Sequence, residues 1–165
     1  MSLAVVDEPP DRSAWLAETV RLLTGSLDRE RGLLLASVAA APDEVLGRGT
    51  EAEWGLGQVA AHLLISERGM AGIILRLAKG EEPGPTGQPR PLPALATKAG
   101  LQALAQKAKA AVERLQKDFP ADPRVETRAR HPYYGDLNCF GWMLVLPYHY
   151  RAHLGAFAEG RPSSL

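Results

Sequence analysis

A proline-rich segment near the middle of the chain constrains the fold more than any other feature. Residues 81–93 read EEPGPTGQPRPLP, with five prolines in thirteen positions. Proline lacks a backbone N–H and its ring clashes with helical backbone, so this segment forms neither a helix nor a central strand. Stretched as polyproline it would reach about 40 Å, close to the roughly 39 Å axis of a 26-residue helix. The segment can therefore return along a whole helical bundle.

Apolar residues before this connector recur at the spacing of two α-helices. Asp11 and Ser13 are candidate N-caps for the first helix, which we expect to run to about residue 41. The second helix opens after Trp54 and Gly55, with Gln58 placed as the partner in a capping box, and ends at Gly80. The first apolar stripe comprises Trp15, Leu16, Thr19, Val20, Leu23, Leu27, Leu34 and Val38.

Two more helices are expected after the connector, over 94–119 and from near Asn138 to Gly160. Within the loop that joins them, only residues 123–134 hint at extended structure, and no alternating run is long enough to build a sheet. The sequence thus predicts an all-α fold over 1–165 as one domain, with residues 1–10 flexible. It is a four-helix bundle whose long proline-rich crossover makes the second and third helices parallel.

Charge and composition exclude several classes of partner. The chain has 19 basic and 19 acidic side chains in 165 residues, without a basic cluster. It therefore lacks the field that holds a nucleic acid or an anionic membrane. No apolar run approaches the roughly 20 residues that span a bilayer, and the N-terminus is acidic where a signal peptide is basic. We expect a cytoplasmic protein. Its only cysteine is Cys139, so any metal must be held by His or carboxylate.

Two histidines in the last helix form an H-x-x-x-H pair. At 100° per residue, His149 and His153 lie about 40° apart on one helix face and one turn apart along it. They share this face with apolar residues, namely Trp142, Val145, Leu146 and Ala156. Imidazoles that face a core need partners for their nitrogens. Either a shared metal ion or separate backbone carbonyls and buried waters can supply them.

A third histidine favours the metal. His62 lies on the inward stripe of the second helix, with Val59, Ser66, Gly69 and Ile73. His62, His149 and His153 together would bind one divalent ion and leave positions open for water or substrate, which is the arrangement of a catalytic site. Zn, Ni and Fe all suit such ligands, so the sequence does not choose between them.

These residues carry a family resemblance. Trp54 precedes His62 by eight residues, a stretch His131-Pro132-Tyr133-Tyr134-Gly135 precedes the last helix, and that helix contains H-x-x-x-H-L. In this order the chain resembles the DinB/YfiT-like metalloenzymes over nearly its whole length. The resemblance implies a four-helix bundle, a divalent ion on the three histidines, and a homodimer. Relatives include S-transferases and isomerases that use low-molecular-weight thiols.

Two positions depart from the family pattern. Gly55 stands where many relatives have Ser, so the second helix lacks a side-chain cap there. Pro147 lies two residues before His149, inside the last helix, and predicts a kink or bulge that re-aims His149 or alters the ligand geometry.

Other candidate residues have two interpretations each. We interpret His131 as a solvated loop residue, with a substrate-facing role as the alternative. Tyr133 and Tyr134 would either line the mouth of the site or pack on helix ends. Cys139 near the start of the last helix is more simply a small buried residue than a reactive thiol.

The leading functional hypothesis is a divalent-metal enzyme that activates a water or a small thiol for attack on an electrophile. No carboxylate base lies on the histidine stripes, because Glu67 projects about 140° from His62 and Glu159 lies beyond the last-helix pair. Catalytic and substrate-binding residues are therefore unassigned. The alternatives are a metal-dependent hydrolase and a non-catalytic stress protein that binds a metal or another ligand.

Overall fold

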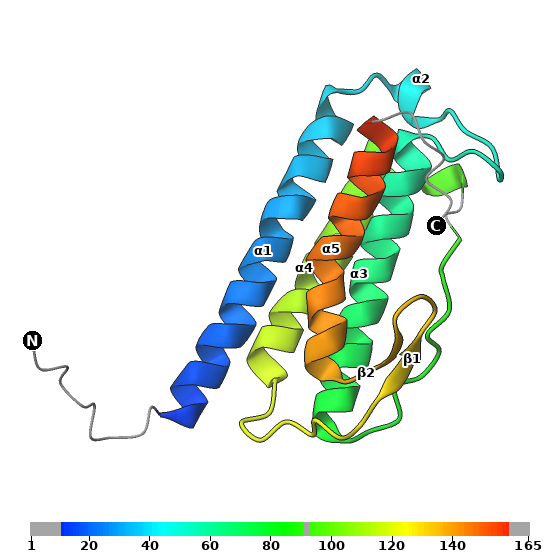
Figure 1. The fold of residues 1–165 in the computed structure, drawn as a ribbon. Helices are drawn as coiled ribbons and strands as arrows, with labels where there is room; N and C mark the ends of the chain where they lie inside the picture. The colour runs from blue at the N-terminus through cyan, green and yellow to red at the C-terminus, as the bar shows by residue number, and fades with distance from the viewer. Residues whose placement is uncertain (1–10, 91–92, 159–165) are drawn as a thin grey trace, which may run out of the picture.

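Four long helices pack side by side in the structure, a computed structural model that describes residues 11–90 and 93–158 (Figure 1). They are α1 (Arg12–Ala40), α3 (Leu56–Lys79), α4 (Lys98–Asp118) and α5 (Cys139–Ala158). The all-α four-helix bundle is therefore confirmed. Smaller elements complete the described chain: α2 (Asp43–Leu46), a 3-10 turn η1 (Pro93–Leu95), and the strands β1 (Ala129–His131) and β2 (Gly135–Leu137). The expectations for residues 1–10 and for a helix end at Gly160 lie outside the described residues.

The connector returns along the bundle as predicted, so that α3 and α4 run parallel (Figure 1). Contacts at both ends of the two helices agree with this direction. Near their starts, a Cβ built on Gly57 would lie 2.9 Å from the Cβ of Ala96. Beyond their other ends, the Arg124 N–H donates to the Ala78 carbonyl at 2.8 Å. The crossover runs the length of the bundle between α3 and α4, so these two helices are parallel. The helices α1 and α5 both run antiparallel to them (Figure 1).

Most helix ends form where the sequence signals placed them. Asp11 caps α1 by accepting a backbone N–H at 2.9 Å. The Gln58 side chain accepts the Gly55 N–H at 3.0 Å, which is the predicted half of a capping box. Gly80 ends α3 in the left-handed conformation, with φ of 75°. Asn138 caps α5 through its side chain at 3.0 Å.

Local signals indicated the smaller elements only in part: residues 123–134 hinted at extended structure, and β1 lies within them. Strands β1 and β2 pair antiparallel, with Arg130 opposite Asp136, inside the segment predicted as a loop. Each strand has only three residues, too few for an alternating pattern to show. The indole N–H of Trp142 donates to the Ala129 carbonyl at 3.3 Å and joins the hairpin to α5. Trp15, which the spacing placed on the apolar stripe of α1, is 61% exposed.

A charged cluster interrupts the mainly aliphatic core between α1, α3 and α5. Arg31 of α1 donates to one carboxylate oxygen of Glu67 of α3, and the hydroxyl of Tyr150 of α5 donates to the other. All three side chains are buried. Burial raises the pKa of Glu67, while the bonds from Tyr150 and Arg31 act in the opposite direction. Burial and the neighbouring Glu67 charge raise the pKa of Tyr150. None of the described helices is long and apolar enough to cross a bilayer.

Breaking this ion pair on one side should destabilise the fold strongly. In Glu67→Gln, the buried Arg31 charge loses its buried counter-charge and keeps only Asp28, whose side chain is 54% exposed. We expect the free energy of unfolding to fall by about 3 kcal/mol, as measured by urea denaturation. The double variant Arg31→Met, Glu67→Gln removes both charges and should recover most of that loss.

A surface pair provides the matched control. Glu18→Gln removes the same charge from an exposed pair with Arg21 and should lower the free energy of unfolding far less than Glu67→Gln does. If Glu67→Gln lowers the free energy of unfolding no more than Glu18→Gln does, the buried cluster stabilises the fold no more than a surface ion pair does.

Candidate functional site

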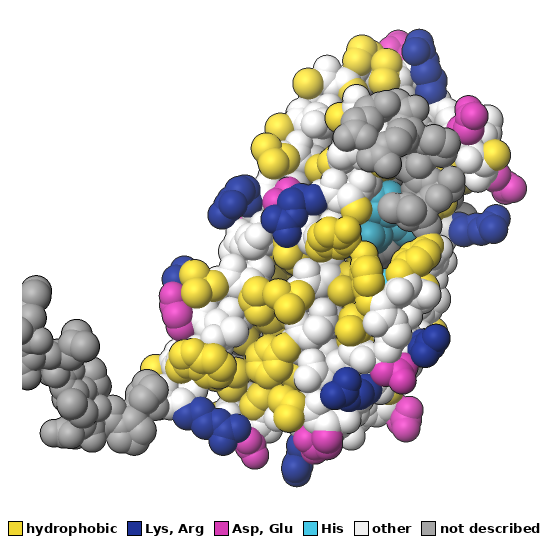
Figure 2. Space-filling view, viewed as in Figure 1, with side chains coloured by type: hydrophobic (Ala, Val, Ile, Leu, Met, Phe, Trp, Pro, Cys, Tyr) yellow, Lys and Arg dark blue, Asp and Glu magenta, His cyan; other side chains and the backbone are white. Residues whose placement is uncertain are grey.

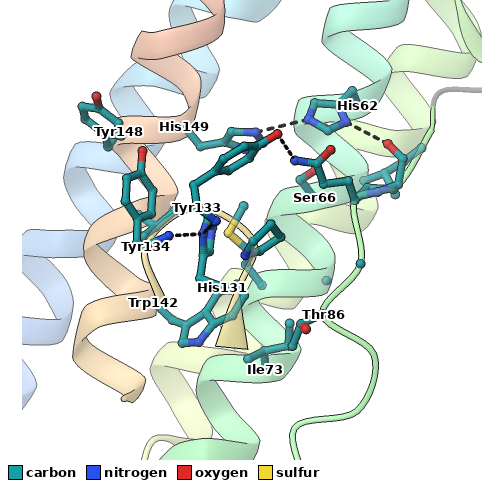
Figure 3. Close-up of a pocket in the computed structure, with 18 of the residues that line it drawn as sticks. His62, Ser66, Ile73, Thr86, His131, Tyr133, Tyr134, Trp142, Tyr148 and His149 are labelled. Atoms are coloured by element: carbon teal, nitrogen blue, oxygen red, sulfur yellow. Dashed lines mark hydrogen bonds between the residues drawn. The ribbon is translucent and has the colours of Figure 1, made fainter. Parts of the chain in front are cut away.

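The three predicted histidines converge between α3 and α5. His62 lies in the first half of α3, and His149 and His153 lie one turn apart on α5. The Nε2 atoms of His62 and His149 are 3.2 Å apart, the contact drawn as a dashed line between the two rings in Figure 3. One ring nitrogen from each of the three residues lies within 4.8 Å of the other two. The packing of α3 against α5 therefore brings His62 close to two histidines that lie 87 and 91 positions later in the chain.

This spacing fits a shared metal ion. Two imidazole nitrogens that bind a tetrahedral Zn²⁺ at about 2.05 Å lie about 3.3 Å from each other. The His62 and His149 nitrogens already have that separation, at 3.2 Å. His153 needs only a small movement to reach the same centre, because the largest separation in the set is 4.8 Å. The donor set thus suits a divalent ion of the kind that prefers imidazole.

The connector fixes the tautomer of His62. Its Nδ1–H donates to the backbone carbonyl of Pro89 at 2.8 Å, so the lone pair lies on Nε2, the nitrogen that faces His149. Histidines that bind metals are commonly oriented in this way by a bond from their other nitrogen. The Trp54 ring lies 4.9 Å from the His62 ring and supports its other side. The sequence placed Trp54 beside the site but gave no sign of Pro89.

Burial keeps the imidazoles of His62 and His149 neutral. It lowers the pKa of His62, against a smaller raising effect of the Pro89 carbonyl. The pKa of His149 falls to about 2, chiefly through burial and then through the neighbouring charges of His153, His62 and His131. Neutral rings keep the lone pairs that metal coordination requires, so protons compete weakly for the site at neutral pH.

The two departures from the family pattern do not prevent the site from forming. α5 remains helical on both sides of Pro147, and His149 still meets His62. Gly55 has a local packing reason, because a Cβ there would lie 2.0 Å from the carbonyl oxygen of Arg48. A serine would therefore clash with the loop that precedes α3 unless that loop moved.

A cavity of about 310 Å³ opens directly onto the histidines (Figure 3). Its walls come from α3, the connector, the hairpin turn and α5. The amide of Gln88 in the connector donates to the hydroxyl of Tyr133 in the hairpin turn, which links the two segments beside the cavity. Figure 2 shows imidazole atoms at the surface in a hollow bordered by hydrophobic side chains. The connector is therefore a wall of the site as well as a link between helices.

The structure corrects our main interpretation of His131. This residue is not solvated: it is 8% exposed, on strand β1, and its ring lies 4.8 Å from those of both Tyr134 and Trp142. Burial lowers its pKa. It lines the cavity together with Tyr133 and Tyr134, which supports the substrate-facing alternative for all three. A single sequence could not show this, because the burial arises from a contact between the hairpin and α5.

Of the three remaining candidates, Ser66 lines the cavity, whereas Glu67 and Cys139 do not. Ser66 lines the cavity, and its hydroxyl is buried without a hydrogen-bond partner among the described residues. Glu67 points the other way, into the cluster with Arg31 and Tyr150, so it is not a base for this site. Cys139 is fully buried and burial raises the pKa of its thiol, as expected of a packing residue.

Comparison with solved structures supports the fold. The chain is similar to the crystal structure of TT2238, described as a four-helix bundle protein, with a TM-score of 0.65 and 23% sequence identity. The match covers 85% of this chain and 98% of that one, and at this identity it concerns the fold alone. A search of curated proteins finds no match.

Comparison with family models identifies the family. The model of the DinB superfamily matches residues 26–157, which include all three histidines, Trp54 and the hairpin. The match covers most of the sequence and agrees with the resemblance seen in the motifs. The chain belongs to the DinB superfamily.

Proposed function

We propose that this protein is a metal-dependent enzyme whose divalent ion is held by His62, His149 and His153. The cavity that opens onto the three donor nitrogens carries the proposal, because a purely structural metal needs no such space beside it. Membership of a family that generally binds metals supports it further. Zn, Ni and Fe all match a set of three imidazole ligands.

A metal at this site would supply an activated water or thiolate at neutral pH. The chain's own residues would hold the electrophile beside it. Among the described residues, no Asp or Glu lines the cavity. Attack by water generally requires a base to take its proton, whereas a thiol ionises near pH 8.5 even without help. Without a carboxylate base, either nucleophile would depend on the metal to lose its proton, and the resemblance to thiol-dependent relatives favours the thiol.

We therefore favour S-transfer from a low-molecular-weight thiol. The thiol sulfur would form a bond to an electrophilic carbon, the leaving group would depart with its electron pair, and the thiol proton would pass to solvent. The connector and hairpin would limit the entry of competing water. A metal-dependent hydrolase and a non-catalytic binding protein are the alternative outcomes of the experiments below.

The metal prediction concerns stoichiometry. Wild-type protein reconstituted with excess Zn²⁺, Ni²⁺ or Fe²⁺ and then desalted should retain about one ion per chain by elemental analysis. His149→Ala and His153→Ala should each lower the affinity at least tenfold, because each removes one of three ligands. His131→Gln is the matched control, since it changes the only histidine outside the set. Unchanged affinity in both alanine variants would refute the ligand assignment.

The turnover prediction concerns the thiol. Holo protein should transfer bacillithiol or mycothiol to 1-chloro-2,4-dinitrobenzene faster than metal-free protein or His153→Ala, as followed by absorbance of the thioether product. Equal rates in all three samples would remove the metal from the reaction. No transfer with any thiol would favour the hydrolase or the non-catalytic protein instead.

We further propose that the protein is a homodimer. Large exposed hydrophobic side chains recur on one stripe of α1, at Trp15, Leu22 and Leu33, and on α5 at Leu144 and Tyr148. Figure 2 shows hydrophobic side chains gathered over the face of α1 and α5. A contiguous apolar patch on a surface commonly marks an interaction site.

Sedimentation equilibrium tests this interface. Wild-type protein should sediment as a dimer, and Leu22→Glu should shift it toward the monomer because a buried unpaired charge is costly. The matched control is Val125→Glu, which changes an exposed apolar residue outside both helices. A monomeric wild type would refute the dimer, and a dimeric Leu22→Glu variant would place the interface elsewhere.

A further inference from the structure

The cavity beside the histidines carries no charged side chain among its described lining residues. Most of its walls are apolar or aromatic, with Ile65, Met70 and Ile73 from α3 and Trp142 and Val145 from α5. An ionic group placed there would lose its hydration without gaining a counter-charge from these walls. Without the metal, the cavity therefore favours neutral ligands, and its volume of about 310 Å³ suits a compact one.

One lining residue presents a hydrogen-bond donor of fixed direction. The Nδ1 atom of His131 accepts the backbone N–H groups of Tyr133 and Tyr134, at 3.2 and 3.4 Å. A ring nitrogen that accepts an N–H carries a lone pair, so the hydrogen of the neutral imidazole lies on Nε2. The hairpin turn thus sets the tautomer of His131, just as the connector sets that of His62.

Stacking fixes the orientation of the same ring. Trp142 and Tyr134 each lie 4.8 Å from His131, with Tyr134 stacked at an interplanar angle of 27°. Within the described chain, Nε2 has no hydrogen-bond partner recorded, while Nδ1 has two. Figure 3 shows the His131 ring between the hairpin and Trp142, within the group of side chains that encloses the cavity. The ring is held in place, and its free donor is available to a ligand.

We infer that the cavity binds a neutral molecule with an aromatic or branched aliphatic body and one hydrogen-bond acceptor, and that His131 Nε2–H donates to that acceptor. This ligand class rests on the proposed function, since it would be the electrophile of that reaction. As a thiol sulfur bonds to the carbon of a carbonyl-type group, the electrons of the C=O double bond move onto the acceptor oxygen, and they return to the carbon when the leaving group departs with its electron pair. A fixed donor at that oxygen stabilises the developing charge.

Binding to metal-free protein tests the ligand class separately from the reaction. Three probes share nearly one shape: 2-acetylnaphthalene carries a neutral acceptor, 2-isopropylnaphthalene has none, and 2-naphthoate is an anion. Equilibrium dialysis of the EDTA-treated full chain should show binding of both neutral probes and at least tenfold weaker binding of the anion. Equal binding of 2-naphthoate would overturn the exclusion of charge.

Two variants identify the donor. His131→Phe keeps a ring against Trp142 and Tyr134 but removes the N–H, so affinity for the ketone should fall about five- to tenfold, the usual worth of one hydrogen bond. Affinity for the hydrocarbon should change less than twofold. Ser66→Ala is the matched control, because the Ser66 hydroxyl is buried in the cavity lining and has no hydrogen-bond partner among the described residues. Loss of the ketone preference in Ser66→Ala and its retention in His131→Phe would overturn the assignment to His131.

A measurement on wild-type protein tests the same hydrogen bond without the risk that His131→Phe disturbs the hairpin. In protein labelled with ¹⁵N-histidine, the Nε2–H signal of His131 should shift when 2-acetylnaphthalene is added and stay in place with 2-isopropylnaphthalene. Absence of a shift at a saturating ketone concentration would refute the hydrogen bond even if His131→Phe misfolds. Neither experiment contains metal or thiol, so failure of the proposed function would leave both results unaffected.

Discussion

The proline-rich crossover is the constraint on which the rest of the molecule depends. Because it returns along the bundle before α4 begins, α3 and α4 run parallel, and α5 lies antiparallel beside α3 (Figure 1). That neighbourhood brings His62 to His149. The same segment supplies the Pro89 carbonyl that orients His62 and a wall of the cavity. If a short turn joined α3 to α4 instead, the cavity would lose that wall and His62 would lose its bond to the Pro89 carbonyl.

The sequence predicted the features that depend on neighbours along the chain. Helix caps at Asp11, Gln58 and Gly80 are short-range hydrogen bonds and backbone preferences, so they can be identified within a few residues. The inward direction of His62, His149 and His153 followed from helical periodicity, which a bundle preserves. Their meeting required only that α3 and α5 pack together, which the crossover and family resemblance made the natural expectation.

Features that depend on tertiary contacts could not be predicted in the same way. The burial of His131 requires Trp142 and Tyr134 to lie on its two sides, and a loop sequence does not determine how a hairpin folds onto a helix. Glu67 looked like an isolated polar residue off the histidine stripe. Its role in the core exists only because Arg31 reaches it from α1, 36 positions earlier. The Pro89 carbonyl carries no side-chain signal at all.

The histidine cluster and the buried cluster of Arg31, Glu67 and Tyr150 lie on different faces of the helix pair α3 and α5. Helical geometry links the position of one cluster to that of the other. Ser66 and Glu67 are consecutive on α3, as are His149 and Tyr150 on α5, and successive side chains point about 100° apart. Tyr150 can reach Glu67 only if α5 is rotated so that His149 turns toward His62. The buried cluster with Arg31 therefore sets the rotation of α5 as well as joining three helices. The desolvation cost of burying these charges is offset by the bonds that Arg31 and Tyr150 make to Glu67, and the same contacts keep His149 beside His62.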